Sequence, residues 1–149
     1  MEERLDKMTF ENFEHKADIG IRGKGKSIEE AFQEAGKAMF SIEINLKNVK
    51  KVKKIKISCN AQNVEELFVE WLNALLAQSS VHEMMFSDFK VKIKENKTEG
   101  KFSLEGEAFG EKFDEKRHEP KLEIKAATYS QLKVFKDQNQ WICQCIVDV

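Results

Sequence analysis

Two stretches of the chain repeat apolar residues at the spacing of an amphipathic helix. The first follows Ser27 and the second follows Asn63, and each of these residues has a glutamate three positions later, Glu30 and Glu66. That spacing is typical of a capping box, in which the side chains and backbone amides at a helix start satisfy one another. We therefore predict one helix beginning after Ser27 and another running from Asn63 to about Ala77. The apolar stripes comprise Ile28, Ala31, Phe32, Ala35 and Met39, and Val64, Leu67, Phe68, Trp71, Leu72, Leu75 and Leu76.

Much of the remaining chain alternates apolar and polar residues, the period of a half-buried β-strand. Strands are predicted at residues 10–14, 19–22, 54–59, 90–94, 102–106, 122–126, 132–135 and 141–147. Turn-forming residues at 96–100 and 137–140 indicate two hairpins. These elements predict an α+β fold with two main helices packed on largely antiparallel sheets. We expect a single domain spanning 1–149, with residues 1–9 as an N-terminal extension.

Composition narrows the function classes. The chain has 149 residues and a net charge of −1, which argues against a stand-alone nucleic-acid binder because such proteins carry a basic excess. No apolar run approaches the roughly 20 residues that cross a bilayer, and Met1–Thr9 lacks a signal-peptide core. We expect no membrane association, a cytoplasmic location and reduced thiols.

Several residues carry candidate chemistry alongside a simpler structural interpretation. Cys143 and Cys145 share a strand face, but two thiols do not complete a zinc site, and buried structural cysteines are common. The glycines and lysines of 23–26 lack the phosphate-loop spacing and fit a turn before a helix. The basic run at 50–54 is typical of a solvated face, with a partner or RNA contact as the alternative. Lys125 lies on a predicted strand beside apolar residues, where a lysine needs a partner, so we predict a contact with a partner protein or with nearby carboxylates.

Asp18 follows a strand-like segment, and the chain ends with Asp148 and Val149. If Asp18 lay beside the terminus, two aspartates and the terminal carboxylate would offer three hard anionic ligands suited to Ca²⁺ or Mg²⁺. Nothing in the residues alone brings positions 18 and 148 together. The simpler interpretation is therefore two aspartates that face water.

The same segments resemble the archease family. The resemblance is carried by six stretches in the family's order, spread from about residue 10 to the last residue: 15–21 (HKADIGI), 27–32 (SIEEAF), 38–40 (AMF), 67–73 (LFVEWLN), 123–129 (EIKAATY) and 146–149 (IVDV). Two positions depart from the usual pattern: Lys16 replaces a threonine, and Ser130 replaces a histidine.

The resemblance implies a protein that is not itself an enzyme. Archeases assist the RNA ligase that joins 2′,3′-cyclic-phosphate or 3′-phosphate ends to 5′-hydroxyl ends, promoting its guanylylation and multiple turnover in tRNA splicing or RNA repair. The family also implies a divalent-cation site, Ca²⁺ in preference to Mg²⁺, formed here by Asp18, Asp148 and Val149. The expected partner is the 3′-phosphate RNA ligase, with only weak or indirect RNA contact. The alternative is a small metal-dependent hydrolase or nuclease using the same carboxylates.

Overall fold

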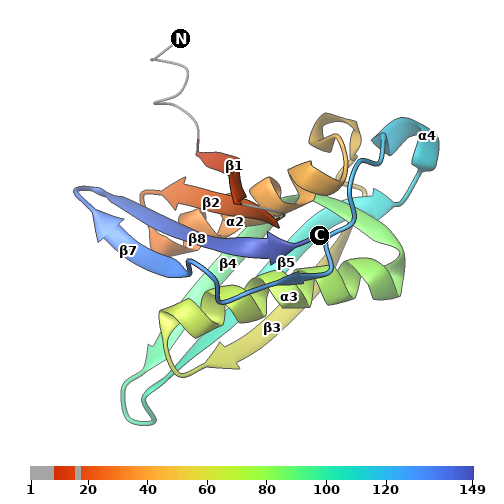
Figure 1. The fold of residues 1–149 in the computed structure, drawn as a ribbon. Helices are drawn as coiled ribbons and strands as arrows, with labels where there is room; N and C mark the ends of the chain where they lie inside the picture. The colour runs from red at the N-terminus through yellow and green to blue at the C-terminus, as the bar shows by residue number, and fades with distance from the viewer. Residues whose placement is uncertain (1–8, 16–17) are drawn as a thin grey trace.

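The computed structural model describes residues 9–15 and 18–149, and these form two antiparallel sheets with helices between them (Figure 1). The strands are β1 Phe10–His15, β2 Asp18–Gly25, β3 Lys53–Ala61, β4 Met84–Asn96, β5 Lys101–Lys112, β6 Ala126–Ala127, β7 Lys133–Asp137 and β8 Gln140–Asp148. The helices are α2 Ile28–Glu43, α3 Val64–His82 and the short α4 Glu115–His118, with a 3₁₀ turn η1 at Leu46–Asn48. None of the helices in the described part of the chain is long and apolar enough to cross a membrane.

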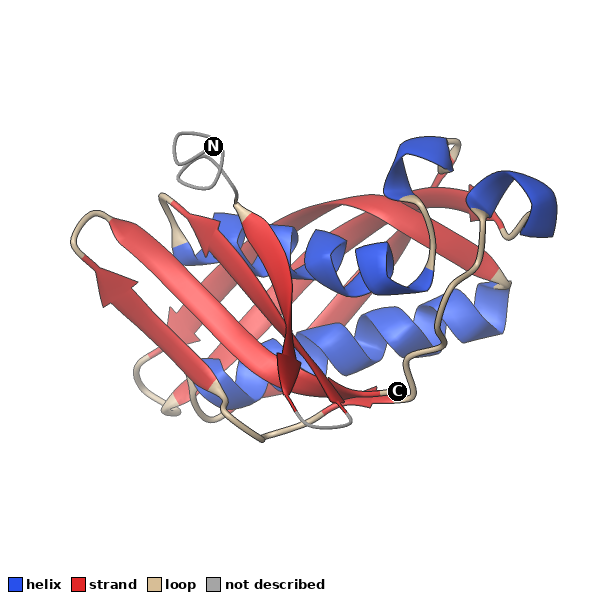
Figure 2. Cartoon of the chain, turned by 45° about the horizontal axis from the view of Figure 1, so that its top comes forward, coloured by secondary structure: helices blue, strands red, loops and turns tan. Residues whose placement is uncertain are grey.

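The first sheet has the strand order β1-β2-β8-β6, with β7 also paired to β8, and the second has the order β3-β5-β4. All pairings are antiparallel. Both long helices lie between the two sheets, as the rotated view shows (Figure 2). The buried side chains of both helices and both sheets form one core cluster. The α+β prediction is therefore confirmed.

Both helix starts are confirmed, together with their caps. The amide of Glu30 donates to Ser27 Oγ over 3.1 Å, and the amide of Glu66 donates to Asn63 Oδ1 over 2.8 Å. Helix α3 continues to His82, five residues beyond the predicted end at Ala77. The extension is polar, but Ser79 is buried and its hydroxyl donates to the carbonyl of Met84, which ties the last turn to β4.

The strand predicted at 122–126 is wrong. Only Ala126–Ala127 pair with β8, and the residues before them run past the end of α2. The amide of Lys121 donates to the carbonyl of Glu43, and the amide of Ile124 donates to the Glu43 side chain. Because a helix end and a side chain satisfy these backbone groups, no neighbouring strand is required. Strand β4 also begins at Met84, earlier than the predicted residue 90.

The predicted N-terminal extension, 1–9, lies outside the described residues except for Thr9. The carbonyl of Thr9 accepts the amide of Lys24 at 2.7 Å, and its hydroxyl bonds the carboxylate of Glu34. Thr9 is therefore held against both β2 and α2.

The core depends on close contact between each helix and a sheet. Trp71 of α3 is fully buried, and its indole Nε1 donates to the carbonyl of Phe32 in α2 over 3.0 Å. Its ring lies over Gly106 of β5, where an added Cβ would come within 2.8 Å of it. On the other side, Gly23 of β2 lies directly against the backbone of α2. Gly23 and Gly25 therefore allow β2 to pack closely against α2. Both lie within strand β2 and not in the turn that the sequence predicted.

We expect Gly23→Ala to destabilise the fold by about 2–3 kcal/mol or more. The added Cβ would come within 2.1 Å of the Ala31 carbonyl oxygen, and backbone atoms cannot move aside as a flexible side chain can. Urea denaturation measures this free energy. The matched control is Gly100→Asn, in the β4–β5 turn, where φ is +65° and nothing lies near the added atom. A Gly23→Ala protein as stable as the control would contradict the packing argument.

Candidate functional site

The end of β8, where Asp148 lies, is next to the start of β2, where Asp18 lies. The pairing of β2 with β8 aligns Ile19 with Val147, so the next step in the same register aligns Asp18 with Asp148. Residues directly opposite one another in an antiparallel pair share a face, with Cβ atoms about 4.5–5.5 Å apart. The structure therefore brings together two residues separated by almost the whole chain.

The other edge of β8 is occupied by β6 and the residue before it. Ala126 is aligned with Asp148, and the amide of Lys125 donates to the Asp148 carbonyl over 2.8 Å. The backbone of Lys125 therefore lies beside the end of the chain at Val149. We call the group formed by Asp18, Lys125, Asp148 and Val149 the β8 corner; Figure 2 shows this end of β8 beside the C-terminus.

The prediction for Lys125 needs correction in one respect. It was based on a lysine among apolar neighbours on a strand, but Lys125 precedes the strand and its side chain is exposed. Only its backbone amide contacts Asp148, so a contact of the Lys125 side chain with a partner or with the carboxylates stays a prediction. Lys16, which replaces a threonine of the usual pattern, lies outside the described residues.

The donors at the β8 corner are suited to a hard cation. Asp18 is half-buried and Asp148 is exposed, and neither has an ion-pair partner among the described residues. Their two side chains and the terminal carboxylate provide only oxygen ligands, which fit Ca²⁺ or Mg²⁺ better than Zn²⁺. Within residues 9–15 and 18–149, no three His, Cys, Asp or Glu side chains form a metal cluster, so a site here needs the terminal carboxylate or backbone oxygens.

The cysteines have a structural role. Cys143 and Cys145 are both fully buried, on the face of β8 that carries Val147 against the core. Burial raises the pKa of Cys143 well above its usual range and that of Cys145 to about 12. A thiol with a raised pKa is a poor nucleophile and a poor metal ligand, which favours the structural interpretation.

The basic run at 50–54 is largely engaged within the fold. Lys51 lies 3.2 Å from the Asp88 carboxylate, and Lys54 lies 2.9 Å from that of Glu107. The backbone amide of Lys50 donates to Glu111 over 2.8 Å. These contacts fit the interpretation of the basic run as a solvated surface with ion pairs. Exposed ion pairs of this kind contribute little to the free energy of unfolding.

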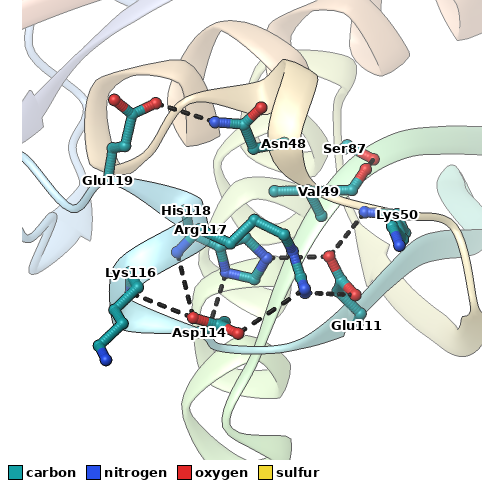
Figure 3. Close-up of polar contacts among 10 residues, drawn as sticks. All are labelled: Asn48, Val49, Lys50, Ser87, Glu111, Asp114, Lys116, Arg117, His118 and Glu119. Carbon is teal, nitrogen blue, oxygen red and sulfur yellow. Dashed lines mark hydrogen bonds and ion pairs between the residues drawn. The ribbon is translucent and has the colours of Figure 1, made fainter.

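A second polar cluster, which the sequence did not indicate, surrounds Glu111. Figure 3 shows His118, Arg117 and Lys50 converging on its carboxylate. The contacts are His118 Nε2 at 2.9 Å, Arg117 Nη2 at 2.7 Å and the Lys50 amide at 2.8 Å. Burial raises the pKa of Glu111, but the hydrogen bonds from His118 and Lys50 and the charge of Arg117 outweigh it and leave the pKa below its usual value.

The tautomer of the buried His118 follows from its partners. The amide of Asp114 donates to His118 Nδ1 over 3.0 Å, so Nδ1 carries no proton and Nε2 donates to Glu111. The nearby hydroxyl of Ser87 donates to the Val49 carbonyl and does not reach the histidine. The cluster therefore holds α4 against β5 and shows no nucleophile positioned for catalysis. No sequence signal could have identified it, since His118 and Glu111 match no motif.

We expect His118→Phe to destabilise the protein by about 2–4 kcal/mol at neutral pH, because it leaves Glu111 short of a donor and the Asp114 amide without an acceptor in a buried place. Denaturant unfolding measures the loss. His82→Phe is the control, since His82 is half-buried and its ring, among the described residues, bonds only Gln78 of the same helix. Equal losses in both variants would show that the Glu111 cluster does not hold α4.

Comparisons with known proteins place the chain in a family. The model of the Archease protein family (MTH1598/TM1083) matches residues 10–149. "Protein archease" from Pyrococcus furiosus is 40% identical over 141 residues, covering 94% of this chain and 98% of that protein. The one from Sulfurisphaera tokodaii is 36% identical over 140 residues, with the same shares covered.

Two solved structures have a similar fold. The solution structure of Methanobacterium thermoautotrophicum protein 1598 is 26% identical, with a TM-score of 0.78 over 95% of this chain and 99% of that one. A Thermotoga maritima crystal structure described as an archease, possible chaperone, is 21% identical, with a TM-score of 0.58 over 92% and 94%. The second likeness concerns the fold alone.

Proposed function

The chain belongs to the archease family, and from that premise we propose that it is a protein cofactor of an RNA ligase. The ligase joins 2′,3′-cyclic-phosphate or 3′-phosphate RNA ends to 5′-hydroxyl ends in tRNA splicing or RNA repair. The protein promotes guanylylation of the ligase with GTP and lets it turn over repeatedly, in the cytoplasm and without catalysing a reaction of its own.

The observation that carries this proposal is the β8 corner. The family motifs around Asp18, Lys125 and Asp148 are far apart in the chain, and the pairings of β2 and β6 with β8 put them at one end of one sheet. The exposure of Lys125 and Asp148 leaves their side chains accessible to a partner. We assign this end of the sheet as the surface that meets the ligase, with Lys125 as a contact residue.

We further propose that Asp18, Asp148 and the Val149 carboxylate bind a divalent cation, Ca²⁺ in preference to Mg²⁺. Carboxylates held close together repel one another, and a bound cation would offset that repulsion and fix their geometry. The residues themselves orient the oxygens: Asp148 is held through its carbonyl by the Lys125 amide, and Asp18 is held at the start of β2. The proposed ion would organise the docking surface and take no part in a reaction.

The first test is stimulation of the ligase. A cognate 3′-phosphate RNA ligase with GTP should form its GMP adduct faster, and complete more turnovers, with this protein than without it. The protein alone should leave the RNA intact, and cleavage would favour the hydrolase alternative. Lys125→Met should reduce the stimulation, whereas Lys133→Met, an exposed lysine on β7, should not. An unchanged rate of adduct formation with the wild type would refute the proposed function.

The second test is cation binding itself, measured by titration calorimetry with Ca²⁺ and with Mg²⁺. We expect Asp18→Asn, Asp148→Asn and an extension past Val149 each to lower the affinity by about tenfold or more, because each removes or displaces one anionic ligand. Asp137→Asn, exposed at the other end of the β7–β8 hairpin, should bind as the wild type does. Equal affinities across the whole set would eliminate the site.

A further inference from the structure

A groove lies where the C-terminal ends of α2 and α3 meet the segment 119–125, and most of its lining lies outside the family motifs. Its volume is about 530 Å³, and its lining is mainly apolar. Two large apolar side chains of the lining are exposed, Phe113 at 41% and Leu122 at 49%. Exposed apolar groups beside a hollow are typical of a binding surface.

Glu43, the last residue of α2, lies in this groove and is only 8% exposed. Its Oε2 accepts the amide of Ile124 at 3.0 Å, while its Oε1 has no hydrogen-bond partner in the described part of the chain. Nor does any cation of the described residues lie within 4.0 Å of it. Burial of this carboxyl, aided by the nearby charge of Glu123, raises its pKa to about 7 despite the Ile124 hydrogen bond. A cation that enters the groove would stabilise the ionised form of this buried carboxyl group.

The other charges around the groove have the same sign. Glu83, from the end of α3, and Glu123 also line it, and Lys121 is the one basic residue of the lining among the described residues. The ammonium of Lys121 is directed to the Ser41 carbonyl, 3.0 Å away. The last turn of α2 has no basic residue, and the C-terminal ends of both helices carry negative partial charge.

We propose that this groove binds the side chain of an arginine or lysine that a partner protein presents within an apolar segment. The cationic group meets the Glu43 carboxylate, and the apolar neighbours pack on Phe113 and Leu122. A free polyamine would satisfy the charge but would leave these apolar side chains uncovered. The charge and the apolar surface together therefore select a polypeptide.

The groove is linked to the β8 corner through two consecutive amides. Ile124 donates to Glu43 in the groove, and Lys125 donates to Asp148 at the corner. A partner protein that covers the groove therefore lies close to the β8 corner. The groove proposal nevertheless does not require that the partner be an RNA ligase, because it concerns only the chemistry of the occupant.

The test compares two peptides that differ only in charge, acetyl-Leu-Arg-Leu-amide and its citrulline counterpart, titrated at pH 8 and followed by NMR. Wild type should bind the arginine peptide about tenfold or more tightly than the citrulline peptide. Glu43→Gln should abolish that difference, and Glu99→Gln, in the exposed β4–β5 turn, should keep it. Leu122→Ser should weaken both peptides alike. Equal binding of the two peptides by wild type, or spermidine binding as tightly as the arginine peptide, would overturn the proposal.

The pH dependence provides a second readout. Between pH 8 and pH 6 Glu43 takes up a proton, so the affinity of wild type for the arginine peptide should fall by about tenfold, while that of Glu43→Gln should change little. The pH dependence of the free energy of unfolding provides a second comparison of the same two proteins. Since the pKa is raised in the folded state, wild type should lose stability as the pH rises from 4.5 to about 7, and Glu43→Gln should not. Identical pH profiles for the two proteins, in binding or in stability, would count against Glu43 as the buried acid.

Discussion

The antiparallel pairing of β2 with β8 is the constraint on which the rest of the structure depends. It joins the first and last parts of the chain in one sheet, with Ile19 aligned with Val147. Because side chains alternate between faces, the same register sends Cys143, Cys145 and Val147 into the core and sets Asp148 opposite Asp18 on the other face. A shift of this register by one residue would turn the core-facing side chains of β8 outward and the outward-facing ones into the core. Core packing and the geometry of the β8 corner are therefore specified together.

The helices keep this sheet in place. They are packed between two sheets, so neither can shift without disturbing both, and Trp71 links them by donating to the Phe32 carbonyl in the middle of the core. Gly23 allows α2 to approach β2 closely, and Gly106 makes room for the ring of Trp71 on β5. The β8 corner lies at the strand ends of this interior, and the groove lies where the ends of α2 and α3 meet the segment 119–125.

The segment 119–125 joins these features, and it owes its shape to polar groups, not to strand pairing. The amides of Lys121, Ile124 and Lys125 donate to the Glu43 carbonyl, the Glu43 side chain and the Asp148 carbonyl, respectively. It also follows α4, which the buried Glu111–His118 pair holds against β5. The polar contacts of this region thus position the backbone on both sides of the groove and at the β8 corner.

The sequence by itself determined the elements whose signals are local. Ser27 and Asn63 cap the helices as predicted, and the apolar run of 141–147 forms a central strand, because capping and side-chain pattern depend on near neighbours in the chain. The family resemblance added Asp18, Asp148 and Val149 as a group. Only the tertiary structure decided that the start of β2 lies beside the end of β8, that Glu111 bonds His118, and that residues 121–125 leave the strand pattern at Glu43. Each of these depends on contacts between distant segments, and no local pattern encodes which distant group will satisfy a given amide or carboxylate.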